Sequence, residues 1–175
     1  MQSCLLPPSQ NAYKTLVDLG GLEAESAYGY DGEDEACKFN RSKVAVRVTG
    51  GLEISQDEHE MAQWLLKNGP ISIALNAFAM QFYMGGVSHP YSFLCSPSGL
   101  DHGVLIVGFG VHTTRFLHRV QPYWIIKNSW GPGWGEAGYY RLGSRDSRVL
   151  TNWLLLELNH GWGLDFQVFK VPDKS

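Results

Sequence analysis

Two stretches of the chain space their apolar residues as a helix does. The first, at 9–19, places Ala12, Leu16 and Leu19 on one face and ends at Gly20-Gly21, which predicts a short helix. The second, at 55–68, carries an apolar stripe from Met61 to Leu65 and stops at Gly69. Ser55 and Glu58 match the spacing of a capping box, so we expect this helix to begin near Ser55.

Other stretches follow the two-residue period of strands. Residues 43–49 alternate strictly, with Val44, Val46 and Val48 on one face, and 70–76 form a second apolar run. Residues 100–110 are almost continuously apolar, which predicts a central strand, and 123–126 are apolar and aromatic. A polar loop is expected at 111–122. Few helices beside several strands indicate an α+β fold, with an antiparallel sheet or small barrel flanked by helices.

Length and charge narrow the classes of function. The 175 residues suit one domain or one lobe of a larger one, and 44% hydrophobic residues allow a buried core. A net charge of −3 without a basic run makes nucleic acid an unexpected partner. No apolar run approaches the roughly 20 residues that a membrane helix needs, and residues 1–10 lack the features of a signal peptide.

The three cysteines are an odd number, so at least one thiol has no partner within the chain. Cys4, Cys37 and Cys95 all lie in polar, turn-rich surroundings, which favours disulfide or metal use over simple packing. No CxxC or HxxxH pair is present, so a zinc site is not expected. A metal site built from His102, His112 and His118 has only a weak basis because these histidines lack ligand spacing.

One histidine and one asparagine stand at matching strand ends. His102 opens the apolar run at 100–110, and Asn128 follows the run at 123–126. If these strands pair antiparallel, the Asn128 amide oxygen can accept from the imidazole and hold its tilt. A histidine held in this way can act as a general base or pair with a thiolate, although a structural histidine is the commoner reading of such a position.

At these residues the chain resembles a known family. LDHGVLIVGFG at 100–110, followed by YWIIKNSWGPGWGEAGYY at 123–140, resembles the histidine and asparagine blocks of papain-like cysteine peptidases, closest to the cathepsin F and cathepsin W branch. The resemblance covers about 1–142 and implies the C-terminal portion of the papain-like fold, mainly its β-rich right lobe. Residues 143–175 form a divergent tail, in which 153–158 is expected to be helix and 164–171 strand.

The resemblance implies a role for each matching residue. His102 is the catalytic imidazole, Asn128 orients it, and Asp101 adjusts the charge beside it. Trp130 shields the His–Asn hydrogen bond. The substrate cleft takes residues from both strands and from the glycine-rich turn: Ala74, Leu100, Asp101, Gly103, Trp130 and Trp134.

The nucleophile block of the family is not found in the chain. The family carries its cysteine in a CGSCW-like block at the start of a long helix, and no such block occurs here. Cys4 precedes Leu5-Leu6-Pro7-Pro8, so it lacks the helix N-terminus that would stabilise a thiolate. By resemblance Cys4, Cys37 and Cys95 are disulfide cysteines, and the partners of the first two are expected in a missing N-terminal part. The family's partner of Cys95 lies in the C-terminal tail, but residues 143–175 of this chain contain no cysteine.

Two classes of function follow from this resemblance. In the first, the chain is the C-terminal portion of a lysosomal or extracellular cysteine endopeptidase that acts on peptides and proteins and is bound by cystatin-type inhibitors. Such an enzyme needs no cofactor or metal, and this chain is expected to be inactive without the missing lobe. Alternatively, it is a non-enzymatic pseudo-peptidase or binding fragment that retains half of a cleft.

Overall fold

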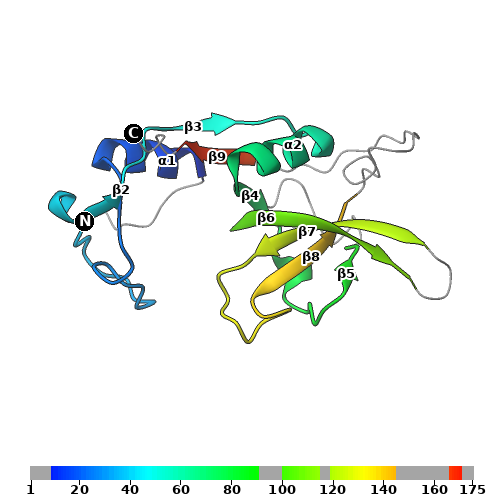
Figure 1. Ribbon diagram of the computed structural model, residues 1–175. Coiled ribbons are helices and arrows are strands. Elements are labelled where there is room, and N and C mark those ends of the chain that lie inside the picture. The colour runs from blue at the N-terminus through cyan, green and yellow to red at the C-terminus, as the bar shows by residue number, and fades with distance from the viewer. Residues whose placement is uncertain (1–8, 91–99, 115–118, 145–165, 171–175) are drawn as a thin grey trace. The chain divides into compact units, whose positions relative to one another are not determined.

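The computed structural model describes residues 9–90, 100–114, 119–144 and 166–170 (Figure 1). It divides into two compact units, Ile54–Phe166 and a smaller unit of Met1–Glu53 with Gln167–Ser175. None of the helices in the described residues is long and apolar enough to cross a membrane.

The smaller unit contains the first helix and two short strand pairs. Helix α1 (Ser9–Leu19) confirms the prediction for this stretch. Strands β1 (Leu22–Glu23) and β2 (Val44–Val46) pair antiparallel, and the 3₁₀ turn η1 (Arg41–Lys43) precedes β2. The alternation at 43–49 therefore yields a shorter strand than predicted, because Lys43 belongs to the turn.

The second strand pair of this unit joins distant parts of the chain. Strand β3 (Gly50–Glu53) pairs antiparallel with β9 (Phe166–Lys170). Strand β9 confirms the strand expected within 164–171. The helix expected at 153–158 lies outside the described residues.

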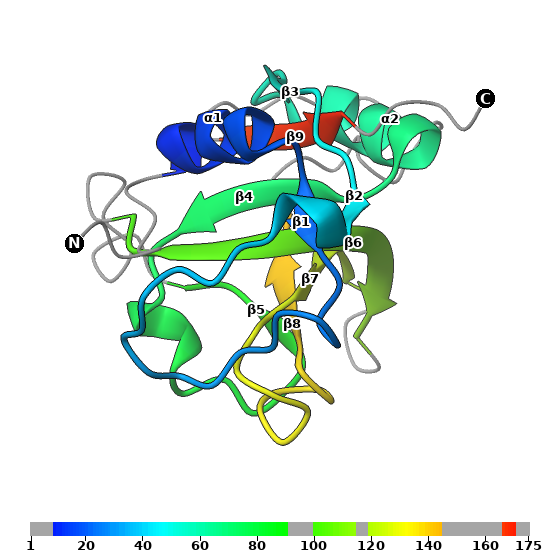
Figure 2. The ribbon, with the colours of Figure 1, turned by 90° about the vertical axis from the view of Figure 1, so that its left-hand side faces the viewer.

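The larger unit is built on strands in the order β4-β6-β7-β8-β5. These are β4 (Ile71–Leu75), β6 (His102–Thr113), β7 (Val120–Lys127), β8 (Tyr139–Gly143) and β5 (Val87–Ser88). All neighbours are antiparallel except β5 and β8, which run parallel. Figure 2 shows β4 and β6 side by side, and β6 is central as its apolar run predicted.

Within the predicted loop at 111–122, residues 111–113 and 120–122 are strand, so the prediction of a loop is wrong for these six residues. Strand β6 continues to Thr113 and β7 begins at Val120, with His112 opposite Gln121 in an antiparallel hairpin. Val111, Thr113 and Val120 are β-branched and favour an extended backbone. This preference outweighs the polarity of the segment, which suggested a loop.

Helix α2 (Glu58–Asn68) begins three residues later than the capping box predicted. Asp57 is the N-cap, because its carboxylate accepts hydrogen bonds from the backbone N–H groups of His59 (2.9 Å) and Glu60 (3.1 Å). Ser55 instead accepts from the N–H of Asp57 at 3.2 Å. Gly69, at φ 95°, ends the helix as predicted.

Side chains from α2 and the sheet form the core of the larger unit. Glu58 joins the two layers: its carboxylate accepts from the indole N–H of Trp124 at 2.8 Å and from the hydroxyl of Ser144. The most buried apolar side chains are those of Met61, Ile71, Ile73, Met80, Ile106, Trp124, Ile126 and Tyr140. This packing fixes the strand ends on which the site is built.

Candidate active site

The His102–Asn128 pair forms as the strand pairing predicted. His102 is the first residue of β6, and Asn128 follows the last residue of β7. The register sets Leu105 opposite Lys127, so the start of one strand lies beside the end of the other. His102 Nε2 and Asn128 Oδ1 are 2.8 Å apart, and Asn128 is 9% exposed.

A second donor fixes the orientation of the Asn128 amide. The backbone N–H of Ser129 donates to Asn128 Oδ1 at 2.8 Å, so the oxygen, and not the NH₂ group, points toward both partners. Because that oxygen can only accept, His102 Nε2 carries the proton and donates it. The neutral imidazole then keeps its lone pair on Nδ1, which is the atom left to exchange a proton with a reactant. Sequence reasoning missed Ser129, since a backbone N–H leaves no trace in residue type.

Trp130 covers the imidazole. Its ring stacks on His102 with centroids 4.9 Å apart and planes inclined by 28°. Trp134 meets Trp130 edge to face at 5.0 Å and 82°. Trp130 remains 38% exposed, and the face stacked on His102 limits the access of water to the imidazole.

A buried tyrosine and an ion pair support the turn behind these indoles. Tyr83 contacts Trp134 with ring centroids 5.8 Å apart. The Arg141 guanidinium pairs with Glu136 and lowers the pKa of that carboxyl to about 2, and the N–H of Gly86 donates to Glu136 at 3.1 Å. Sequence reasoning did not identify Tyr83 or this ion pair, because their positions in the chain are far from His102.

The other residues expected in the cleft lie on β4, on β6 or just before β6. Ala74 of β4 lies directly opposite Gly103 of β6, and a Cβ added at Gly103 would meet no atom within 4 Å. The small residues therefore leave open space beside His102. Leu100 is half-buried. The Asp101 carboxylate accepts from the N–H of Ala77 at 2.8 Å, and its own N–H donates to the carbonyl of Leu75 at 3.2 Å, which holds the approach to β6 against the end of β4.

Of the cysteines, only Cys37 lies in the part of the chain that the structure describes, and it is disulfide-bonded. The expectation that its partner lies in a missing N-terminal part stays a prediction. Cys4 and Cys95 lie outside the described residues. Within the described ranges, no group of three or more His, Cys, Asp and Glu side chains is arranged to hold a metal ion.

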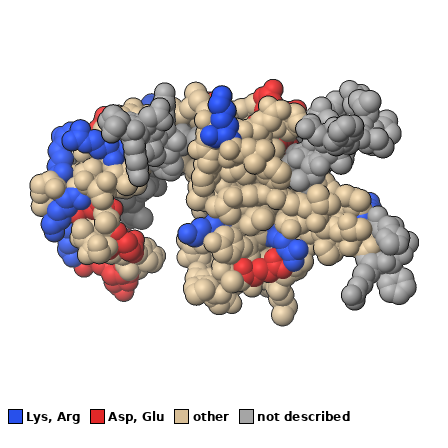
Figure 3. Space-filling view, in the orientation of Figure 1, with Lys and Arg blue, Asp and Glu red and all other residues tan. Residues whose placement is uncertain are grey.

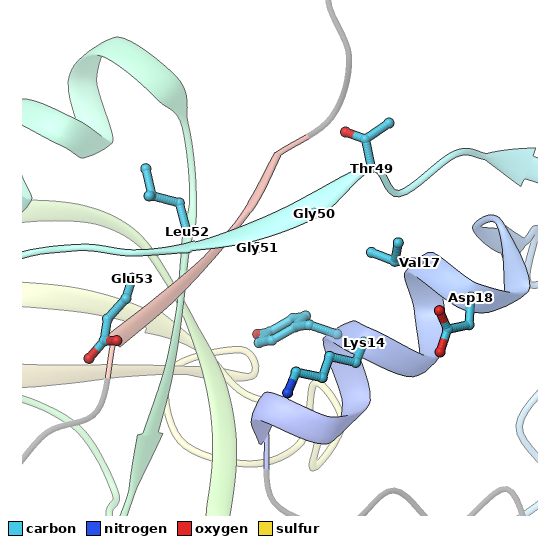
Figure 4. A pocket seen from close by; sticks show the side chains of 9 residues that line it. Lys14, Val17, Asp18, Thr49, Gly50, Gly51, Leu52 and Glu53 are labelled. Carbon is cyan, nitrogen blue, oxygen red and sulfur yellow. The ribbon is translucent and has the colours of Figure 1, made fainter.

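Charged side chains are sparse on the visible face of the larger unit (Figure 3). In the smaller unit, a groove of about 450 Å³ lies between α1 and β3. Lys14, Val17 and Asp18 line it from the helix, opposite the strand residues Gly50 and Leu52 (Figure 4). The groove contains none of the residues assigned to the site.

Sequence comparison adds the decisive observation. The family described as papain family cysteine protease matches residues 2–152. The chain belongs to the papain family. It is 56% identical over 133 residues to cathepsin F of Drosophila melanogaster, covering 75% of this chain and 22% of the relative. Identity to cathepsin F of Mus musculus is 47% over 141 residues, covering 81% of this chain and 29% of the relative. The chain thus spans less than a third of the length of either relative.

Solved structures give the same family and confirm the predicted papain-like α+β fold. Digestive procathepsin L 3 from Tenebrio molitor larval midgut superimposes with a TM-score of 0.73 at 32% identity, covering 92% of this chain and 47% of that one. Bromelain from Ananas comosus, in complex with the inhibitor E64, gives 0.68 at 26% identity over 93% of this chain and 68% of its own. The resemblance noted in the sequence is therefore confirmed for family and fold.

Proposed function

We propose that this chain carries the imidazole half of a cysteine endopeptidase site, with His102 as the proton carrier and Asn128 as the residue that orients it. The observation that carries the proposal is the 2.8 Å contact between His102 Nε2 and Asn128 Oδ1, with the N–H of Ser129 on the same oxygen. This arrangement gives the ring one tautomer and leaves Nδ1 available for chemistry.

The reaction needs a thiol beside Nδ1. The thiol transfers its proton to His102 Nδ1, and the resulting thiolate attacks the carbonyl carbon of a peptide bond. When the tetrahedral intermediate collapses, the C–N bond breaks and the leaving amine takes the proton from Nδ1, which leaves the acyl group on the sulfur as a thioester. Water, which gives a proton to Nδ1, then hydrolyses the thioester, releasing the carboxylic acid and restoring the thiol. Asn128 accepts from Nε2–H throughout, so the ring keeps its orientation while its charge changes. The proposal takes the nucleophile from the part of the peptidase domain that this chain does not span, so that the chain alone is inactive.

The cleft residues suggest how a peptide is held. The open space at Gly103, opposite Ala74 and beside Leu100, suits an apolar side chain two residues before the scissile bond. Trp130 and Trp134 offer an aromatic surface for the residues after it. We assign Asp101 to the charge balance next to His102. Peptides and proteins are the proposed substrates, cystatin-type proteins the proposed inhibitors, and a lysosomal or extracellular space the proposed compartment.

An active-site thiol probe tests the catalytic proposal. A peptidyl epoxide should label a longer protein in which a CGSCW-like block precedes this chain, and His102→Ala should abolish that labelling. The 175-residue chain should stay unlabelled. Labelling of Cys4 in the 175-residue chain would refute the proposal, as would full labelling of the longer His102→Ala protein.

A binding role without catalysis is the second candidate. It is supported by the open side of Gly103, which leaves room for a bound side chain. Under this reading the chain binds a cystatin-type inhibitor or a peptide through Trp130 and Gly103, and His102→Ala leaves the affinity unchanged. Gly103→Leu, which fills the open space, should weaken that binding at least tenfold, and unchanged affinity would remove this candidate.

A further inference from the structure

The aromatic contacts at the site continue beyond the two tryptophans. His102 stacks on Trp130, Trp130 meets Trp134, and Trp134 contacts Tyr83, each through ring centroids 4.9 to 5.8 Å apart. Tyr83 also meets Tyr140 edge to face at 4.6 Å and 88°. The row therefore runs from a partly exposed imidazole to tyrosines that are 8% and 2% exposed.

Tyr83 is the best-anchored member of this row. Its hydroxyl donates to the carbonyl of Gly86 at 2.8 Å and accepts from the backbone N–H of Arg141 at 3.2 Å. Burial raises the pKa of this hydroxyl, and the Arg141 N–H partly offsets the effect, so the group remains a donor at neutral pH. The ring is thus tied at its tip to two separate segments of backbone.

Trp134 has no comparable anchor. Its indole nitrogen is buried and has no hydrogen-bond partner among the described residues, so its position depends on packing. Tyr83 supplies part of that packing, and it also closes the turn: a Cβ at Gly135 would lie 3.0 Å from the Tyr83 ring and 2.7 Å from the carbonyl of Tyr139. The turn that carries Trp134 therefore fits closely against Tyr83.

The geometry points to Tyr83 as a positioning residue for the imidazole. It fixes Trp134, Trp134 limits the tilt of Trp130, and Trp130 stacks on His102. Tyr83 acts only through the two indoles. The functional importance of this role rests on the proposed function, whereas the positioning itself can be measured without any reaction.

The ring-current shift of the His102 Hδ2 proton reports the stack directly. The experiment uses the full 175-residue chain with labelled histidine, and His102→Gln identifies the signal among the six histidines. Trp130→Ala gives the position of the signal without the stack. Tyr83→Leu should move the signal at least half of the way to that position, and Tyr83→Phe should move it less, because the ring is kept and only the hydroxyl is lost.

A core change of similar severity serves as the control. Met61 is 1% exposed and lies on α2, outside the aromatic row, so Met61→Ala should lower stability and leave the His102 signal in place. If Trp130→Ala moves the signal and the Tyr83 variants do not, the positioning role is refuted while the catalytic proposal stands. If Trp130→Ala has no effect, the stack and the positioning role are both refuted. Should Tyr83→Leu fail to fold, Tyr83→Phe carries the same test, and an unmoved signal counts against the role.

Discussion

Asn128 uses the two ends of its side-chain amide differently. Its oxygen accepts from His102 and from the N–H of Ser129, whereas its nitrogen is buried and has no partner among the residues that the structure describes. A buried donor without an acceptor costs about 1–3 kcal/mol. The unpaired Asn128 NH₂ group therefore destabilises the fold slightly, at the residue whose oxygen orients the His102 imidazole.

Replacing Asn128 tests this assignment. Asn128→Ala removes the acceptor of the Nε2–H group, so the corresponding ¹⁵N–¹H signal of His102 should disappear through exchange with water. Ser129→Ala is the matched control, since it keeps the backbone N–H that contacts Asn128, and it should preserve the signal. A protected Nε2–H in Asn128→Ala would contradict the hydrogen bond.

The ion pair between Glu136 and Arg141 should make the free energy of unfolding depend on pH in acid. Arg141 lowers the pKa of Glu136 to about 2, below its ordinary value, so the pair stabilises the fold above the unfolded pKa and loses this effect as pH falls toward 2. Both side chains are partly exposed, which limits the effect to about 1 kcal/mol. The difference in unfolding free energy between wild type and Glu136→Gln should therefore be largest near pH 7 and shrink by pH 3. Arg141→Gln should reproduce this loss, and a difference independent of pH would rule the pair out as its source.

At the scale of elements, the start of α2 shows where sequence reasoning succeeded and where it did not. The apolar stripe and Gly69 gave the helix and its end correctly. The start was wrong because Ser55, Asp57 and Glu58 all suit a helix N-terminus, and only the three-dimensional contacts distinguish them. The Glu58 carboxylate accepts hydrogen bonds from Trp124 and Ser144, which are far along the chain, and Asp57 caps the backbone instead.

A matched pair of substitutions separates the two possible caps. Asp57→Ala removes the acceptor of two backbone N–H groups and should lower the free energy of unfolding by about 1 kcal/mol. Ser55→Ala removes one weaker contact and should cost no more than a few tenths of that amount. Denaturant unfolding of both variants measures the difference. The opposite order would restore the capping box predicted from the sequence.

For the whole molecule, the sequence predicted the family, the central strand and the His102–Asn128 pair, because each is encoded in a local run of residues. It did not predict the length of the β6–β7 hairpin or the aromatic row behind Trp130. These depend on contacts between residues that are distant in the chain, such as Tyr83 and Arg141, and no local pattern reports them.

Exposed aromatic residues predict self-association of the isolated chain. Phe78 and Phe82 are 51% and 76% exposed and meet edge to face at 6.5 Å, and Met84 is 94% exposed nearby in sequence. Apolar residues gathered in this way favour association. Phe78→Ser with Phe82→Ser should lower the weight-average mass measured by sedimentation. Tyr30→Ser, at a single residue that is 91% exposed, is the control and should leave the mass unchanged. A monomeric wild type with a cooperative thermal transition would contradict this prediction.

The long hairpin of β6 and β7 has a consequence for how the protein can vary. His102 and Asn128 lie at its base, while Thr114, whose N–H donates to the carbonyl of Arg119, lies at the tip, the opposite end of the same strands. Residues inserted at that tip extend the ladder outward and leave the pairing of Leu105 with Lys127 unchanged. Evolution can therefore lengthen or shorten the tip freely, and a designer could graft a peptide epitope there, without altering the distance between the imidazole and its amide.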